Sequence, residues 1–249
     1  ELVGGDPLNL GAAFNLNYRH KKVNFFINYG VTYRKVPYKG SIYQEVYEPD
    51  TTWIFKQRNS GTLSGFNNLV RAGIDYYFTE KSILTGSYMN RRLLSERTTD
   101  IKYEDYLFNT SNLTGTSARR QEEDETEPNS EVVLTYKKSF ARKDHELIAE
   151  IKYLDYWENS DQVFTQNFYK PDGSEDVTGA ILQRSLNDEY EKQWLFQVDY
   201  TKPFGQQGKL ETGLRSSFRN MVNDYLVTEA DSAGNFVPLP GLDNVFVYD

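Results

Sequence analysis

Hydrophobic and polar side chains alternate along the first part of the chain. In Leu10–Arg19, every second residue is apolar or aromatic, and the residues between them are small or polar. After the turn Arg19–Lys22, the same alternation runs from Val23 to Arg34. Because successive side chains of a β-strand point to opposite faces, the pattern predicts a two-faced hairpin. Strands of about ten residues are also long enough to cross a bilayer at a tilt.

The same plan recurs three more times. An aromatic residue on the apolar parity precedes each short turn, and a long connection follows each hairpin. Short turns at one rim and long loops at the other are typical of outer-membrane β-barrels. The four aromatic residues are Tyr18, Tyr76, Tyr136 and Tyr200, and the later turns fall at Thr79–Lys81, around Arg142–Asp144 and at Pro203–Gly208.

The connections predicted to be long cover residues 35–65, 92–131, 157–190 and 220–249. Pro and Gly in Lys170–Gly173, and Gly in Asp231–Asn235, predict local hairpin tips, so strands are expected to continue beyond the membrane. Between Glu96 and Glu131 there are ten acidic and four basic residues, a net charge of −6. Its acidic run Glu122–Glu127 is expected to form a solvated loop. A calcium loop is the weaker interpretation, because this run has no Gly for a sharp turn.

The composition of the two strand faces separates a membrane barrel from a soluble sheet. One face holds Leu, Val, Phe and Tyr, and the other holds Gly, Asn, Ser and Arg, which suits lipid on one side and a wet lumen on the other. A soluble β-sheet binding domain, the competing interpretation, would bury the Leu/Phe face in a core. The mean hydropathy of −0.68 and the lack of an apolar run of about 18 residues exclude membrane-spanning helices, but not barrel strands.

Composition and motifs exclude several function classes. The absence of Cys removes disulfide scaffolds and zinc-thiolate sites. A net charge of −8 without a basic stripe argues against nucleic acid as a partner. The chain has no phosphate-binding loop and no metalloprotease or serine-hydrolase motif, so we expect no enzyme and assign no catalytic, cofactor-binding or metal-binding residues. His20 and His145 fall at short turns, where solvated side chains are expected.

Two groups of residues are candidates for contact with a ligand, although the sequence leaves the substrate-binding residues unknown. Four arginines are expected to face the lumen, where pairing with Asp75 or Glu211 is the more economical interpretation. Exposed aromatic residues in the long connections offer large contact areas. The arginines are Arg34, Arg71, Arg215 and Arg219, and the aromatic residues are Tyr43, Tyr47, Trp53, Tyr103, Tyr106, Phe164, Phe168 and Tyr169.

The amino-acid sequences of several hairpins resemble those of the TonB-dependent-receptor-like outer-membrane β-barrel family. Leu134–Phe140 followed by Lys143–Leu147, with the strand ending in Tyr153, is similar to one of its hairpins. So is Gly73–Ser87, and Gly208–Arg215 is similar to its ascending strands. The tail Asn244–Asp249 resembles the stretch before another strand. The likeness extends over the whole chain, but its short motifs identify the superfamily better than the substrate.

This resemblance implies an all-β, antiparallel up-and-down transmembrane barrel of about 22 strands. About eight of them are expected here, so residues 1–249 are interpreted as part of one barrel domain, without its plug domain or a signal peptide. The implied function is energy-coupled uptake of a substrate across the bacterial outer membrane. The implied partners are outer-membrane lipid, a plug domain, an energy-coupling protein and a surface lipoprotein. A small, complete structural or adhesive barrel and the soluble domain remain the alternatives.

Overall fold

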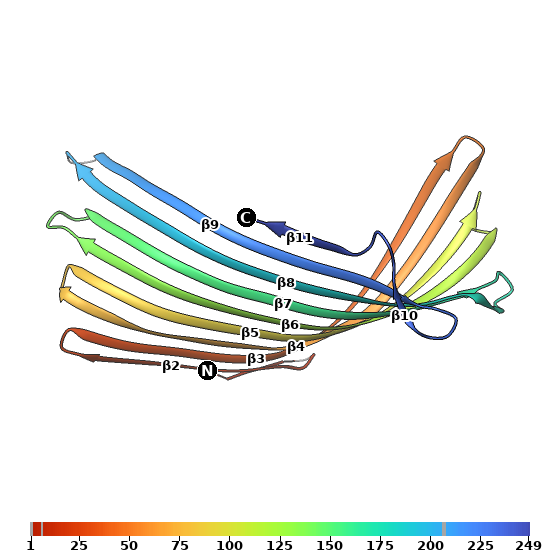
Figure 1. Ribbon diagram of the computed structural model, residues 1–249, viewed down its shortest axis with the longest axis horizontal. Helices are drawn as coiled ribbons and strands as arrows, with labels where there is room; N and C mark the ends of the chain where they lie inside the picture. Colours follow the sequence, from red (N-terminus) through yellow and green to blue (C-terminus); the bar gives the residue numbers. More distant parts are fainter. Residues whose placement is uncertain (1, 6, 206–207) are drawn as a thin grey trace.

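The computed structural model describes residues 2–5, 7–205 and 208–249, which form a single antiparallel sheet of eleven strands (Figure 1). Neighbours in sequence are neighbours in the sheet from β1 to β10, and β11 also pairs with β9. No helix in the described residues is long and apolar enough to cross a membrane. The strands are β1 (Leu2–Gly5), β2 (Asn9–His20), β3 (Val23–Glu48), β4 (Thr51–Thr79), β5 (Ser82–Leu107), β6 (Leu113–Ser139), β7 (Glu146–Tyr169), β8 (Glu175–Phe204), β9 (Gly208–Ala230), β10 (Phe236–Pro238) and β11 (Asn244–Tyr248).

The strands from β3 to β9 are much longer than a bilayer requires. The 26 residues of β3 cover about 85 Å at about 3.3 Å per residue. The hydrocarbon core of a bilayer is only about 30 Å thick. More than half of each long strand therefore lies outside any membrane that the sheet crosses.

As expected, the strands continue beyond the membrane, and they occupy most of the predicted long connections. The chain reverses within a few residues at 49–50, 108–112, 170–174 and 231–235. The two hairpin tips predicted from turn chemistry are confirmed, because Gly173 and Gly234 have φ of 82° and 83° and donate hydrogen bonds to Lys170 and Asp231. The extent of these strands was not predicted, because both faces of the stretches between the tips and the membrane contact water. They therefore lack the apolar alternation that marks a strand.

The short turns lie together at the opposite end of the sheet, on the left in Figure 1. The turn between β2 and β3 consists of Lys21 and Lys22, with Lys21 at a φ of 52°. The turns after β4 and β6 fall where the sequence predicts them. In the predicted turn Pro203–Gly208, residues 203 and 204 belong to β8 and 208 begins β9, while 206 and 207 lie outside the described residues.

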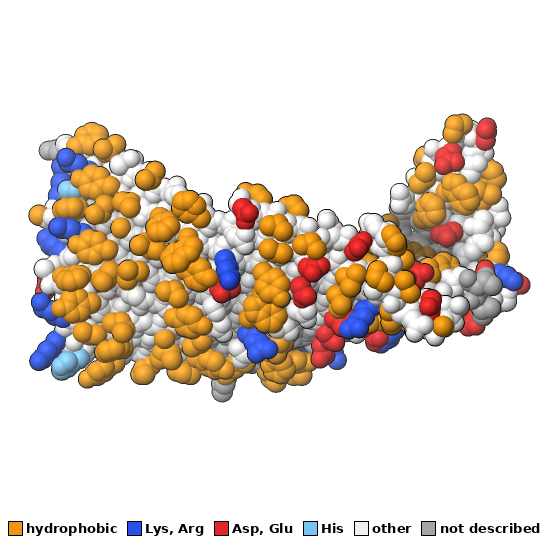
Figure 2. Space-filling model, viewed as in Figure 1, with side chains coloured by type: hydrophobic (Ala, Val, Ile, Leu, Met, Phe, Trp, Pro, Cys, Tyr) orange, Lys and Arg blue, Asp and Glu red, His pale blue; other side chains and the backbone are white. Residues whose placement is uncertain are grey.

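The register aligns the apolar side chains of neighbouring strands in one band. Phe25 of β3 lies opposite Ile74 of β4, and on the other side of β5 the row continues through Leu134, Ile151 and Phe196. These side chains are 40–49% exposed, although they are among the most hydrophobic of the chain. Figure 2 shows this band over the part of the face nearer the short turns, with Lys and Arg along the turn rim and Asp and Glu appearing farther along.

No second layer covers the apolar band within the described residues. Among the described residues, the buried hydrophobic side chains are Ile54, Ile101, Leu195 and Val227, and three of them lie far from the short turns. A soluble sandwich would instead bury the row that runs from Phe25 to Phe196. The arrangement is that of strands whose apolar side faces lipid.

The all-β, antiparallel up-and-down architecture is confirmed, but the strand number is eleven rather than about eight. The eight predicted strands correspond to β2–β9. The additional β1, β10 and β11 have four, three and five residues, too few to show an alternation in the sequence. In the described residues the sheet is open, because the strands at its two ends do not pair with each other.

Candidate ligand-contact surface on the inner face

The inner face, defined as the side of the sheet opposite the apolar band, carries a polar row near the short turns. Asn24 donates a hydrogen bond to Asp75 (2.9 Å), and Thr85 donates another to the second oxygen of that carboxylate (2.7 Å). Farther along the row, Thr135 donates to Glu150 (3.1 Å). Polar groups on a strand that crosses a membrane need such partners when lipid covers the other side. The inner face is therefore built for contact with polar groups.

The four predicted lumen-facing arginines do not pair as the sequence suggested. Arg219 binds Glu191 of the neighbouring β8 (2.7 Å). Glu211 binds Lys209 (2.6 Å), and Asp75 is taken by Asn24 and Thr85. The predicted pairing with Asp75 or Glu211 is therefore wrong, because the register sets those carboxylates beside other partners. The remaining arginines lie on the inner face across from Gly65 (Arg34), Asn28 and Met89 (Arg71) and Gln197 (Arg215).

The acidic run Glu122–Glu127 forms part of β6 and is not the solvated loop that was expected. Its residues pair with β5 on one side, and residues 122–126 pair with β7 on the other. Since side chains alternate along the strand, Glu123, Glu125 and Glu127 share the inner face. The charge density of the run is thus divided between two faces. This alternation and the partners on other strands make a regular strand possible.

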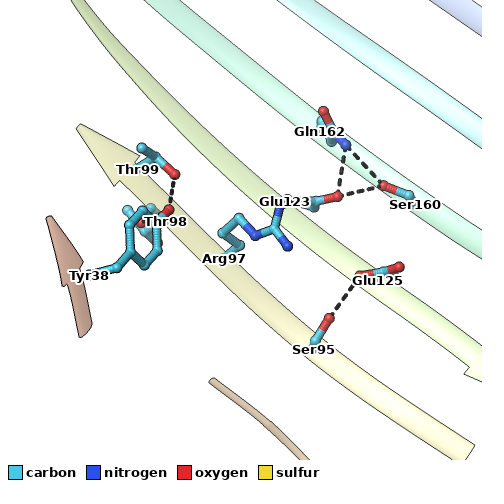
Figure 3. A network of polar contacts seen from close by, with 9 residues as sticks. All are labelled: Tyr38, Ser95, Arg97, Thr98, Thr99, Glu123, Glu125, Ser160 and Gln162. Carbon is cyan, nitrogen blue, oxygen red and sulfur yellow. Dashed lines mark hydrogen bonds and ion pairs between the residues drawn. The ribbon is translucent and has the colours of Figure 1, made fainter. Parts of the chain in front are cut away.

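Neighbouring strands supply partners for the inner-face carboxylates (Figure 3). Arg97 lies 3.4 Å from Glu123, which also accepts hydrogen bonds from Ser160 (3.2 Å) and Gln162 (2.7 Å). Ser95 donates to Glu125 (3.0 Å). The network joins β5, β6 and β7 well beyond the apolar band.

Three inner-face carboxylates converge next to this network. Oxygen atoms of Glu125, Glu127 and Glu158 lie within 4.8 Å of one another. Burial, followed by the neighbouring Glu127, raises the pKa of Glu125 above its usual range. Calcium requires six to eight converging oxygens, and one converging oxygen from each carboxylate supplies only part of such a shell.

A groove of 440 Å³ is lined both by acidic side chains of β6 and by basic side chains of β3 and β5. Arg34, Arg91 and Arg97 line it together with Glu125 and Glu127. Arg91 donates a hydrogen bond to Asn67 (3.1 Å), and Arg97 pairs with Glu123. Both arginine side chains remain exposed to solvent. Opposite charges on its two sides can orient a polar ligand or a polar segment of protein.

The aromatic residues predicted to lie in exposed loops are mostly half-buried on strands. Only Tyr43 and Tyr47 are widely exposed, at 55% and 73%. Both donate hydrogen bonds to Glu45, which lowers the pKa of that carboxyl and raises the pKa of each tyrosine. The half-buried residues are Trp53, Tyr103, Tyr106, Phe164, Phe168 and Tyr169.

Some contacts of the extended strands were not predicted. Tyr38 hydrogen-bonds the Thr99 hydroxyl, and its ring lies over Gly61, where a Cβ atom would be 2.7 Å from the ring carbon Cζ. The guanidinium of Arg119 lies 4.4 Å from the centre of the Phe164 ring. The sequence Ser60-Gly61-Thr62 does not indicate which residues of the neighbouring strands lie beside it. These contacts could be found only from the register.

The two histidines differ in their surroundings. His20 is exposed beside the β2–β3 turn, as expected. His145 is half-buried, stacks on Phe140 at 4.0 Å between ring centres and hydrogen-bonds the Tyr200 hydroxyl (2.9 Å). His145 therefore belongs to an aromatic cluster at the rim, and the expected solvated turn histidine is wrong at this position.

One family of known proteins matches part of this chain. Residues 138–249 match the outer membrane protein beta-barrel family. A search of curated proteins finds no match. Among solved structures, the chain is similar to BauA, the ferric preacinetobactin receptor from Acinetobacter baumannii, at 9% identity and a TM-score of 0.29. That alignment covers 96% of this chain and 49% of the receptor, so the chain spans about half of the receptor's length.

The family match covers the three long strands β7, β8 and β9 together with β10 and β11. It agrees with an exposed apolar band on one face and a polar surface on the other. The chain is thus an outer-membrane β-barrel protein, located in the outer membrane of a bacterium.

Proposed function

We propose that this chain forms part of the wall of a large outer-membrane receptor or transporter barrel, with the substrate contacting the inner face and the extended hairpins. The observation that carries the proposal is the open sheet with one lipid-facing side. In hydrocarbon an unpaired strand edge is costly, so the two open edges call for further strands that close the barrel.

The finer proposal is energy-coupled uptake of the TonB-dependent type. It is supported by the resemblance of the hairpins at 73–87, 134–153 and 208–215 to that family. It is also supported by long extramembrane hairpins carrying exposed Tyr43 and Tyr47, which suit capture of a ligand. The proposed partners are lipid, a plug domain, an energy-coupling protein and a surface lipoprotein. We propose no nucleic-acid partner and no covalent chemistry.

The test compares three strains grown in the same complex medium: wild type, a deletion of this gene and a deletion of the energy-coupling protein. Mass spectrometry of the spent medium records which compounds each strain removes. Transport predicts at least one compound that wild type removes and both deletion strains leave. If the gene deletion removes every compound as wild type does, uptake is refuted. A compound that the gene deletion leaves in the medium, but that wild type and the coupling-protein deletion both remove, would show a passive channel instead.

A further inference from the structure

The apolar band contains a groove that no element of the described chain covers. It has a volume of 760 Å³ and lies over β4 and β5, between walls formed by β3 and β6. Ala72 and Gly86 form its floor, because each stands in a row whose other members are large. In these rows Ala72 lies between Ile27 and Tyr88, and Gly86 lies between Ile74 and Leu134.

The floor of the groove is open above Gly86. A Cβ atom built on this residue would meet only a Leu134 methyl, at 4.0 Å. By contrast, a Cβ on Gly73 of the inner face would come within 2.3 Å of Phe26. The small residue at position 86 therefore leaves space on the lipid side and is not required by close packing. Atoms that line unfilled space lose dispersion contacts, so an apolar occupant of matching shape is favoured.

Three lysines lie at the rim below the groove. Lys22 Nζ reaches the Phe78 carbonyl at the end of β4 (3.4 Å), and the Lys81 carbonyl accepts a hydrogen bond from the Ser139 amide. Lys138 is opposite Ser82, the first residue of β5. None of these lysines forms an ion pair with a described residue, although Lys138 Nζ lies 5.4 Å from the centre of the Phe140 ring. The β4–β5 turn also carries Glu80, but with three lysines at the rim the local charge remains positive.

The groove lies within the depth of one leaflet from the rim. Gly86 follows Lys81 by five residues, about 16 Å along an extended strand, which is about 12 Å of depth for a strand tilted by about 40°. Half of the hydrocarbon core is about 15 Å thick. A phosphate at the lysines thus allows an acyl chain to lie along the groove to Gly86. Tyr76 and Tyr136 flank the path at the level where an interfacial hydroxyl is expected.

We propose that this groove binds one anionic phospholipid, with an acyl chain on the Ala72–Gly86 floor and the phosphate at Lys22, Lys81 and Lys138. Charge complementarity selects an anionic lipid over an apolar protein segment, because an apolar segment offers no anion to three lysines that have no carboxylate partner. The inference rests on the outer-membrane location of the chain and does not depend on transport.

Native mass spectrometry of the purified full protein tests the site. The protein in detergent is exchanged into equimolar phosphatidylglycerol and phosphatidylcholine with identical acyl chains, and the retained lipids are counted. We expect one retained phosphatidylglycerol. Gly86→Leu, which fills the open floor, should lower its retention about tenfold, which corresponds to about 1.4 kcal/mol. Thr212→Leu adds similar bulk at an exposed position of β9 outside the groove and should leave retention unchanged.

The headgroup contribution is tested separately. Replacement of Lys22, Lys81 and Lys138 by Gln should abolish the preference for phosphatidylglycerol over phosphatidylcholine, whereas Lys202→Gln, at the rim of β8, should preserve it. If Gly86→Leu does not fold, Ala72→Leu fills the same floor. The proposal is overturned if filled-floor variants retain the lipid like wild type or if wild type retains both lipids equally. It is also overturned if the groove holds a second copy, seen as a dimer that Gly86→Leu dissociates.

Discussion

The strongest energetic consequence of the fold concerns two adjacent residues of β8 with opposite surroundings. Phe196 lies at the centre of the apolar band, between Trp194 and Val198, and is 40% exposed. Gln197 points to the inner face, where it donates a hydrogen bond to Asp199 (2.6 Å). Phe196→Arg transfers a charge to the lipid side. Gln197→Arg adds the same charge on the polar side, next to a carboxylate.

The expected difference is large enough to measure. An arginine on the lipid face near the bilayer midplane costs about 2–4 kcal/mol, which lowers the folding equilibrium constant about 30- to 1000-fold. Gln197→Arg should change the free energy of unfolding by less than about 1 kcal/mol, because Asp199 can pair with it at a partly solvated site. Urea titration of the full protein in phospholipid vesicles, followed by tryptophan fluorescence, measures both. Equal losses in the two variants would refute the assignment of the faces.

Other predictions concern the extended strands and one glycine. Glu125→Gln should stabilise the protein near pH 8 but not near pH 4, since the raised pKa of Glu125 makes folding less favourable as the pH rises through it; urea titrations showing no pH dependence of the difference would contradict this. Arg184→Gln should destabilise by less than about 1 kcal/mol at neutral pH, because Arg184 lowers the pKa of Asp161, and the difference should disappear as the pH falls through that lowered pKa. Gly73→Ala should cost about 1–3 kcal/mol, because its Cβ would overlap Phe26 and the Gly86 carbonyl; thermal unfolding unchanged from wild type would show that the two strands can separate without cost.

The membrane part of the fold could be predicted from sequence for a definite physical reason. In Val23–Arg34 one face contacts lipid and the other a polar surface, so the period of two is visible in residue type. The register then follows from the short turn, and Phe25 lies opposite Tyr18 as the hairpin requires. Only the short strands at the ends, β1, β10 and β11, were missed.

The extramembrane part could not be predicted in the same way. Along residues 92–131 both faces contact water or neighbouring polar strands, so no hydrophobic alternation survives. The partners of Glu123 and Glu125 lie on β5 and β7, at Arg97, Ser95 and Ser160. Such partners are remote in sequence and have no signature in a single chain. Turn chemistry did predict the tips at 170–174 and 231–235, since Gly there adopts positive φ.

The central claim is that alternate residues of the strands near the short turns contact lipid. The chain has no Cys, so single cysteines at Ile27, Asn28 and Tyr29 can each be labelled with bimane without background in this chain. After reconstitution of the full protein in vesicles, quenching by brominated phospholipid reports contact with acyl chains. The fold predicts strong quenching at positions 27 and 29 and weak quenching at 28. Equal quenching at all three positions, or the reverse pattern, would contradict it.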